Sequence, residues 1–302
     1  MSKSFSLYST NKPLISIVIL AGPHRQNELV RCLKSIMKSS YQTFEIILVD
    51  NSLNPKLTPT IHKKFPYVRI YKMPENVGLL GYNIGFSNAK GQYIFAVDDD
   101  TTIKYDVLEK IVELVKTLPS KVGIIAANMY QPVEKLFFFQ NYINLHISLV
   151  PVFDGAGVIF KKEVFEKVGY YDEDFFMWVN ELDYSLRVLS KGYLIYFAQN
   201  IQVNHYKKSS LRALSVFFTF RNIVKFNIKH FSFFLLPLLF LKNIFSILVL
   251  GFKSKSFSIW IAGVKGIIIG YITCYLSFKK REPVSFLIQV KYLKFYLFNL
   301  QK

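Results

Sequence analysis

Three successive carboxylates, Asp98, Asp99 and Asp100, follow an apolar, β-prone run at residues 93–97. Adjacent carboxylates repel one another, so a fold seldom keeps them together unless a cation or a hydrogen-bonding ligand offsets the repulsion. A hard divalent cation such as Mg²⁺ or Mn²⁺, bridging carboxylate and phosphate oxygens, is the simplest partner. The alternative is an acidic turn in which Asp100 or Thr101 only caps the next helix.

A loop rich in glycine and asparagine precedes that run. Gly78, Gly81 and Gly85 allow close approach of the backbone and unusual dihedral angles. The side-chain amides of Asn76 and Asn83 can bind a ligand or tie the loop to itself. Open α/β sheets bind ligands at the carboxyl ends of their strands. The loop and the carboxylates together therefore predict a nucleotide-diphosphate site.

Two further polar residues follow apolar runs that are predicted to be strands. Asp50 follows the run at residues 44–49, where an Asx turn that closes the strand is the commoner role of such a residue taken alone. Its place at the same predicted sheet edge as the three carboxylates favours a role in the site. His205 follows short predicted strands at residues 193–197 and 201–203. A lone histidine in such a position is either structural or a ligand.

The segment at residues 180–192 is predicted to be a helix, with Asn180 as its N-cap and Leu182, Leu186 and Leu189 as its buried stripe. Glu181 lies in the first turn, where the helix dipole favours an ionised carboxylate that can accept a proton.

The same helix carries an acid and a base four residues apart. Asp183 is spaced to pair with Arg187, which is a structural role. From the residues alone, Glu181 either faces a cleft as a base or only decorates the start of the helix.

The elements that position these residues alternate between strand and helix. Amphipathic helices are predicted at residues 28–37 and 107–118. Such alternation favours an α/β fold with a mostly parallel, doubly wound sheet. The predicted strands of this sheet lie at residues 14–20, 44–49, 68–71, 93–97 and 123–127.

Charge divides the 302 residues unevenly. From Ile201 onward, 16 Lys and Arg residues accompany a single acid, whereas the first 200 residues carry 22 bases and 19 acids. A basic, aromatic-rich end indicates anionic lipid or nucleic acid as a partner. The charges interrupt long apolar runs and no nucleic-acid module is recognisable, which favours lipid. Cys32 and Cys274 indicate neither a disulfide framework nor a zinc site, and the first residues lack the apolar core of a secretory signal.

Two apolar segments near the C-terminus, Ser232–Phe252 and Phe257–Phe278, are each long enough to cross a bilayer. Lys242 and Lys265 lie near their middles, and a central Lys costs about 2.5–3.5 kcal/mol on insertion. The basic segment Val284–Leu300 is typical of an interfacial helix. We expect helices that lie in the cytoplasmic face of a membrane, or a shallow re-entrant pair. Two full spans, a soluble helical subdomain and an oligomer interface are the alternatives.

The order of these blocks resembles the family 2 glycosyltransferases with a GT-A fold, in particular the rhamnosyltransferase-like and galactofuranosyltransferase-like members. The resemblance covers about residues 14–225, and it is the order of the blocks that makes it specific. They are VDNS at residues 49–52, N-x-G-x-x-G-x-N-x-G at 76–85, the acidic triplet, GAGVIFKKEVFEKVGYYDEDFF, the helix with D-x-x-x-R, and the histidine before KKSS. We expect a GT-A catalytic domain over residues 1–210 and a helical, membrane-associating region over 211–302.

The resemblance implies an inverting transfer of a sugar from a nucleotide-diphosphate sugar to a hydroxyl of a lipid-linked or cell-surface glycan. Asp50 matches the contact to the nucleotide base and Asp98 the residue nearer the ribose or phosphates. Asp99 is their neighbour in the nucleotide-sugar site, together with Asn76, Gly78 and Asn83 of the loop.

The resemblance also implies a metal site and a base. Asp100 matches the metal-binding member of the Asp-x-Asp pair, and His205 an additional metal or pyrophosphate ligand. Glu181 falls at the catalytic base.

Two departures from the family pattern concern the site. The base is usually Asp, so either Glu181 or Asp183 fills that role. AGPHR at residues 21–25 replaces the usual segment after the first strand, which puts the nucleotide-base contacts of that loop in question. An inactive nucleotide- or glycan-binding module and a nucleic-acid-binding protein remain the alternative functions.

Overall fold

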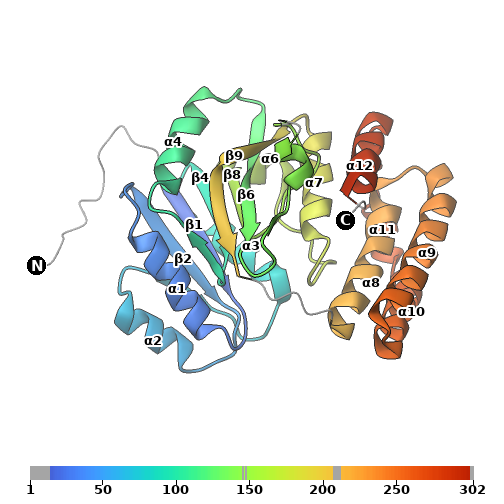
Figure 1. Cartoon of the computed structure of the whole chain (residues 1–302), viewed down its shortest axis with the longest axis horizontal. Coiled ribbons are helices and arrows are strands. Elements are labelled where there is room, and N and C mark those ends of the chain that lie inside the picture. The colour runs from blue at the N-terminus through green and yellow to red at the C-terminus, as the bar shows by residue number, and fades with distance from the viewer. Residues whose placement is uncertain (1–13, 145, 147, 207–211, 300–302) are drawn as a thin grey trace, which may run out of the picture. The chain divides into compact units, whose positions relative to one another are not determined.

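The computed structural model describes residues 14–144, 146, 148–206 and 212–299, with the backbone alone for residues 296–299. Its described residues form two compact units (Figure 1). The first unit comprises those within Met1–Tyr170 and Lys191–Lys207, and the second those within Tyr171–Ser190 and Lys208–Lys302. Tyr171–Ser190 therefore groups with the C-terminal helices.

A sheet of nine strands forms the centre of the first unit. Its order is β3 (Arg69–Lys72), β2 (Phe44–Asp50), β1 (Ile15–Ala21), β4 (Tyr93–Asp98), β8 (Gly157–Lys161), β6 (Val122–Gln131), β9 (Leu194–His205) and β5 (Thr101–Ile103), with β7 (Leu136–Phe137) paired to β6.

Most of these strands run in one direction. β3, β2, β1 and β4 pair in parallel. β8 pairs antiparallel with both β4 and β6, and β9 pairs parallel with β6, so β6 and β9 share the direction of the first four strands. The prediction of a mostly parallel central sheet followed by a helical region is confirmed.

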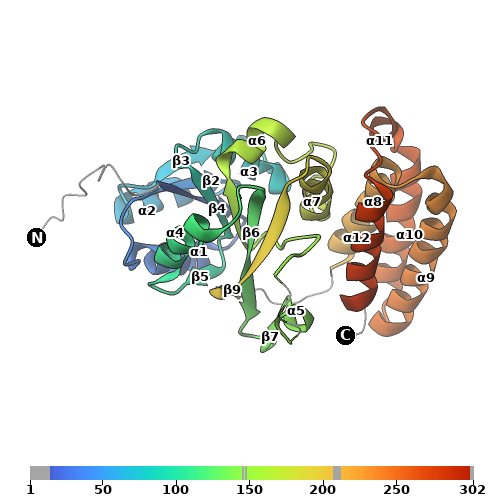
Figure 2. The ribbon, with the colours of Figure 1, turned by 90° about the horizontal axis from the view of Figure 1, so that it is seen from above.

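Helices cover both faces of the sheet (Figure 2). Alternate residues of β1 point to opposite faces, and those on the face of Ile15, Ile17 and Ile19 form one core with three helices. These are α1 (Gln26–Met37), α2 (Leu57–Lys64) and α4 (Val107–Thr117). The opposite face carries η1 (Gly78–Leu80), α3 (Gly81–Ser87) and α6 (Lys162–Val168), and the short α5 (Gln140–Asn144) follows β7.

Two glycines of α3 bring this helix against β1. A Cβ atom at Gly85 would lie 2.2 Å from Cγ1 of Val18, and one at Gly81 would lie 2.5 Å from Cδ1 of Leu20. Gly78 instead has a left-handed φ of 62°. The close approach predicted for Gly81 and Gly85 is therefore made to the sheet.

The structure excludes the capping role that was the alternative for Thr101, and it corrects one predicted pair of strands. Thr101 does not cap a helix, because residues 101–103 form β5 and pair with the end of β9. The two short strands predicted at 193–197 and 201–203 are one strand, β9. A register shift between Ala127 and Asn128 of β6 accommodates the extra residues of β9.

The second unit is helical. Gly266 and Gly270 allow close packing of two of its helices, since a Cβ atom there would lie 2.5 Å from the carbonyl oxygen of Phe217 and 2.8 Å from that of Arg221. Its elements are α7 (Asn180–Ser190), α8 (Ala213–His230), η2 (Phe233–Leu235), α9 (Leu236–Ser254), α10 (Phe257–Ile272), α11 (Tyr275–Lys279) and α12 (Phe286–Asn299).

One helical segment is long and apolar enough to cross a membrane, by length and composition, in the described chain. This segment is Phe233–Ser254, which has 22 residues and a mean hydropathy of 2.3. Only 17% of its apolar 18-residue stretch is buried. The second apolar segment, Phe257–Phe278, is not one continuous helix, because α10 ends at Ile272 after 16 residues. A bilayer core requires about 20 residues.

Candidate functional site

The ends of β2 and β4 lie on either side of β1 at one sheet edge. Ala21 of β1 pairs with Asp50 of β2, and the preceding Leu20 pairs with Asp98 of β4. Because the three strands are parallel, the two carboxylates reach the same edge, as the order of the apolar runs predicts.

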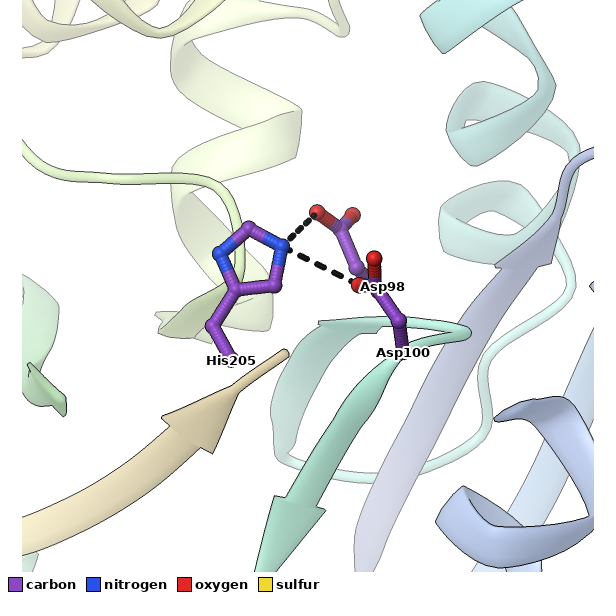
Figure 3. Close-up of side chains that lie close together, drawn as sticks. All are labelled: Asp98, Asp100 and His205. Carbon is purple, nitrogen blue, oxygen red and sulfur yellow. Dashed lines mark ion pairs between the residues drawn. The ribbon is translucent and has the colours of Figure 1, made fainter. Parts of the chain in front are cut away.

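His205 joins this edge through the pairing of β5 with β9. Thr101, which follows the acidic triplet, lies opposite His205 in the register of these strands. Nε2 of His205 lies 3.0 Å from Oδ1 of Asp100 and 3.5 Å from Oδ2 of Asp98 (Figure 3). The structure thus brings His205 beside two carboxylates that precede it by more than one hundred positions in the sequence.

The electrostatics of the cluster favour the ionised form of Asp100. Burial alone would raise the pKa of Asp100, but its interactions with the nearby His205 imidazole and with the charge of Arg25 lower it below its ordinary value. Burial acts against the charged form of His205, yet Asp100 and Asp98 raise the pKa of the imidazole. Asp98 is the more exposed acid, and its Oδ1 accepts a hydrogen bond from the Tyr82 hydroxyl at 2.8 Å.

The three side chains fit a divalent cation. One ligand atom from each of Asp98, Asp100 and His205 can be chosen so that all lie within 4.8 Å of one another. Oδ1 of Asp100 is buried and receives no hydrogen bond of normal geometry from the described residues, although the imidazole is near it. Two carboxylates and an imidazole are ligands that Mn²⁺ accepts, and carboxylates also suit Mg²⁺.

Asp99 takes a different position from its neighbours. Its Oδ2 accepts the backbone N–H of Gly22 at 2.7 Å, and its Oδ1 lies 3.0 Å from Nη1 of Arg25. The same Nη1 donates to Oδ2 of Asp100 at 2.8 Å. Burial raises the pKa of Asp99 to about 7, against the opposing effects of Arg25 and Gly22. Asp99 therefore fixes the Gly22–Arg25 loop, and Arg25 is a member of the site that the sequence did not reveal.

Asp50 is fully engaged inside the protein. Its Oδ1 accepts the backbone N–H and the hydroxyl of Ser52 at 3.1 and 2.6 Å, and its Oδ2 accepts the hydroxyl of Thr58 at 2.7 Å. Asp50 is 1% exposed. This geometry is the Asx turn weighed as the alternative role of the residue.

Asn51 ties the glycine loop to the end of β2. Its amide donates to Oδ1 of Asn76 at 2.9 Å and to the carbonyl of Gly78 at 3.1 Å, and its Oδ1 accepts the N–H of Val77 at 2.9 Å. Asn76 thus ties the loop to itself, and Asn83 lies half-buried on α3. Asn51 was missed, although it follows Asp50 in the VDNS block.

In the second unit, α7 carries the two candidate bases. Glu181 is half-buried in the first turn. Asp183 is fully buried, and its carboxylate contacts Nε of Arg187 at 2.8 Å, Nζ of Lys229 at 2.7 Å and Nε2 of His230 at 2.8 Å. Burial would raise the pKa of Asp183, but these partners hold it far below the ordinary value.

Two details of the predicted α7 are wrong. Asn180 is not an N-cap, because its amide donates to the carbonyl of Phe175 at 2.7 Å and its Oδ1 has no partner in the described structure. Of the predicted leucine stripe only Leu186 is buried, since Asp183 and Tyr184 occupy the interior face. KKSS lies outside the described residues.

The fold of this site is that of the GT-A glycosyltransferases. The structure aligns with a mannosyltransferase from Pyrobaculum calidifontis solved with GDP-Man and Mn²⁺, with a TM-score of 0.59 and 14% identity over 90% of each chain. It also aligns with GalNAc-T7 solved with UDP, GalNAc and Mn²⁺, with a TM-score of 0.60 and 18% identity over 75% of this chain and 49% of that one.

The chain belongs to glycosyl transferase family 2, whose family model matches residues 16–169. A second model, glycosyl transferase family group 2, matches residues 93–269. Glycosyltransferase GlyG of Streptococcus pneumoniae serotype 4 is 30% identical over 115 residues, which are 37% of this chain and 38% of GlyG. The matched part of this chain therefore spans about two fifths of the length of that relative.

Removal of one ligand should weaken Mn²⁺ binding. We expect Asp100→Asn and His205→Ala each to lower the affinity for Mn²⁺ alone by at least about 10-fold, since even loss of an outer-shell partner has such an effect. The measurement is electron paramagnetic resonance of free Mn²⁺ during titration. Asp106→Asn, which removes a carboxylate paired with Lys110, is the matched control. Equal affinity in all three variants would rule out the metal site.

The buried pairs of Asp183 predict a pH-dependent stability. Asp183→Asn should lower the free energy of unfolding by about 3–5 kcal/mol at pH 7, because Lys229 loses a buried partner. The folded-state pKa of Asp183 is lowered, so its contribution is complete above the unfolded-chain pKa of about 3.9 and is lost as the pH falls below it.

Urea unfolding in detergent at pH 7, 5 and 3 measures this effect. The difference in the free energy of unfolding between wild type and Asp183→Asn should become smaller at pH 3. Glu173→Gln, at an exposed acid of the same unit, is the control. If the difference in the free energy of unfolding is the same at all three pH values, the buried ion pairs of Asp183 do not make the predicted contribution to stability.

Proposed function

We propose that this chain is a metal-dependent, inverting glycosyltransferase that moves a sugar from a nucleotide-diphosphate sugar to an acceptor hydroxyl. The observation that carries the proposal is the cluster of Asp98, Asp100 and His205 at the carboxyl edge of a GT-A sheet. Two neighbours in structure were solved with a nucleotide or nucleotide sugar and Mn²⁺, which supports the same ligand class here.

Asp100 and His205 would hold the cation, with Asp98 contributing its exposed oxygen. A bound divalent cation stabilises the negative charge that develops on a leaving diphosphate. Asp98 would also contact the ribose or the phosphates of the donor. Asp100 and His205 are buried, and the exclusion of water would strengthen their electrostatic interaction with a cation.

The nucleotide would lie along the ends of β1 and β2 and the glycine loop. Asp50, Asn76 and Gly78 shape this surface through their own hydrogen bonds, and Asn83 follows on α3. Asp99 contributes by fixing the Gly22–Arg25 loop, which replaces the usual family segment.

Glu181 is the base that we favour. Asp183 has three cationic or imidazole partners and a lowered pKa, so it has little tendency to take up a proton. Glu181 lies two residues earlier, in the first turn of the helix, where the dipole supports an ionised carboxylate. It would remove the acceptor proton as the hydroxyl attacks the anomeric carbon, and a single displacement inverts the configuration.

The acceptor that we propose is a lipid-linked or cell-surface glycan, and the proposed location is the cytoplasmic face of a membrane. Phe233, Phe234, Phe245 and Phe252 are each more than 60% exposed in the second unit, and residues 211–302 are rich in Lys and Arg. Exposed apolar groups with basic residues suit an anionic lipid surface. We retain residues 1–210 as the catalytic domain and residues 211–302 as the membrane-associating region.

The sharpest test of activity is nucleotide release from a panel of UDP-, GDP- and dTDP-sugars with Mn²⁺ or Mg²⁺. Glu181→Gln should lower kcat by about 10²- to 10⁴-fold, the usual contribution of a general base, while donor affinity stays within a few-fold. Glu173→Gln is the matched control. Release by neither wild type nor control with any donor, with nucleotide binding retained, would identify an inactive binding module instead.

Membrane association is tested with vesicles. The full chain should sediment with vesicles that contain anionic phosphatidylglycerol more than with phosphatidylcholine alone, and Phe234→Glu with Phe252→Glu should reduce binding at least about 10-fold because two exposed aromatic anchors are lost. Val133→Glu, at an exposed apolar residue of the first unit, is the control. Equal sedimentation of all variants, or none for wild type, contradicts the proposal.

A further inference from the structure

The backbone that leads into α7 has a rare conformation. Trp178 and Val179 have φ values of 64° and 72°, in the left-handed region. Residues with side chains seldom adopt this region, and a β-branched residue such as Val is an outlier there. Such a turn persists only where surrounding contacts hold it, and outliers of this kind gather at functional sites. Glu181 follows the turn by two residues.

Asn222 of α8 holds this turn. Its side-chain amide donates to the carbonyl oxygen of Met177 at 2.7 Å and to that of Trp178 at 3.1 Å. Nη1 of Arg221 donates to its Oδ1 at 3.2 Å. Asn222 is 0% exposed, so solvent cannot replace these bonds. A single buried amide therefore binds two successive carbonyl groups at the point where the chain turns left-handed.

The same face of α8 holds the segments on both sides of the turn. Lys225 and Lys229 follow Asn222 by three and seven residues, which places them on one helix face. Lys225 pairs with Asp174, and Lys229 contacts Asp172 at 2.6 Å and Asp183 at 2.7 Å. The loop before the turn and the helix after it are thus both attached to α8.

α8 is in turn held by the helices that follow it. Gly270 of α10 allows contact with the backbone of α8. Ser277 donates to Oδ2 of Asp174 at 3.1 Å, and Lys280 contacts Oδ1 of Asp172 at 2.6 Å. The helical region therefore does more than offer an apolar surface, because it fixes the turn in front of Glu181.

We propose that Asn222 is a positioning residue, which fixes the Trp178–Val179 turn and thereby the position of Glu181 for proton removal. The inference rests on the proposed function, in which Glu181 is the base. It assigns to Asn222 an effect on turnover that acts through the position of Glu181, with no contact between Asn222 and donor or cation.

The test compares Asn222→Leu with Asn243→Leu. Leucine has the same number and branching of side-chain heavy atoms as asparagine but no hydrogen-bond donor, and Asn243 is a buried residue of α9 in the same unit. Both changes are made in the full chain carrying Trp260→Phe, which leaves Trp178 as its single tryptophan. The measurements are kcat and donor KM from nucleotide release with the best donor of the panel, affinity for UDP with Mn²⁺, and tryptophan emission.

We expect Asn222→Leu to lower kcat about 10- to 100-fold, since small misplacement of a reacting group has effects of this size. Donor KM and affinity for UDP with Mn²⁺ should stay within about two-fold, and the emission of Trp178 should shift. Adding Val179→Gly should restore part of kcat, by at least about three-fold, because glycine adopts positive φ readily. Asn243→Leu should leave every measurement near that of the parent.

Several results would overturn the inference. They are a kcat for Asn222→Leu within two-fold of the parent, an equal loss in Asn243→Leu, or a parallel loss of nucleotide affinity, which marks general destabilisation. If leucine at position 222 prevents folding, Asn222→Ser is measured in the same way and judged by the same results.

The failure of the proposed function is distinguishable from the failure of this inference. Full activity of Glu181→Gln removes Glu181 as the base, and the positioning role falls with it even if the emission of Trp178 shifts. Loss of activity in Glu181→Gln with an active Asn222→Leu leaves the base in place and removes only Asn222.

Discussion

Repulsion among three adjacent carboxylates is the constraint around which the first unit is built. The sheet separates them by giving each a different partner: Tyr82 donates to Asp98, the Gly22–Arg25 loop binds Asp99, and His205 faces Asp100. Arg25 also reaches Asp100 and neutralises part of the charge. What is left is an open group of ligand atoms from Asp98, Asp100 and His205 at the sheet edge. The arrangement that reduces the repulsion among the three carboxylates therefore also leaves ligand atoms that can bind a cation.

The second unit shows a related balance of buried charge. Lys225 and Lys229 of α8 offset the charges of Asp172, Asp174 and Asp183, and these lysines would otherwise be costly to bury. The imidazole of His230 also contacts Asp183. If one of these ion pairs is broken, the remaining charge is left buried without a partner. The network of pairs therefore holds α7 and the preceding loop on α8 more specifically than apolar packing alone would. A region with the composition of a membrane anchor thus also carries a polar interior.

Much of the first unit could be predicted because its signals are local. The apolar runs of β1, β2 and β4 and the helical stripe of α1 follow directly from their periodicity, and parallel pairing then places Asp50 and Asp98 at one edge. The missed features depend on partners distant in sequence. β5 exists because β9 pairs with it, and Arg25 joins the site through Asp99. Burial of Asp183 depends on Lys229 and His230, 46 and 47 residues later, so no pattern within α7 could reveal it.

The most direct test of the central claim is a crystal structure of the full chain grown with Mn²⁺ and UDP, with diffraction data collected at the manganese absorption edge. The account predicts an anomalous peak within coordination distance of the carboxylates of Asp98 and Asp100 and of Nε2 of His205, with the diphosphate of the nucleotide beside it. A manganese peak elsewhere, or a nucleotide bound away from the carboxyl ends of β1, β2 and β4, would contradict it.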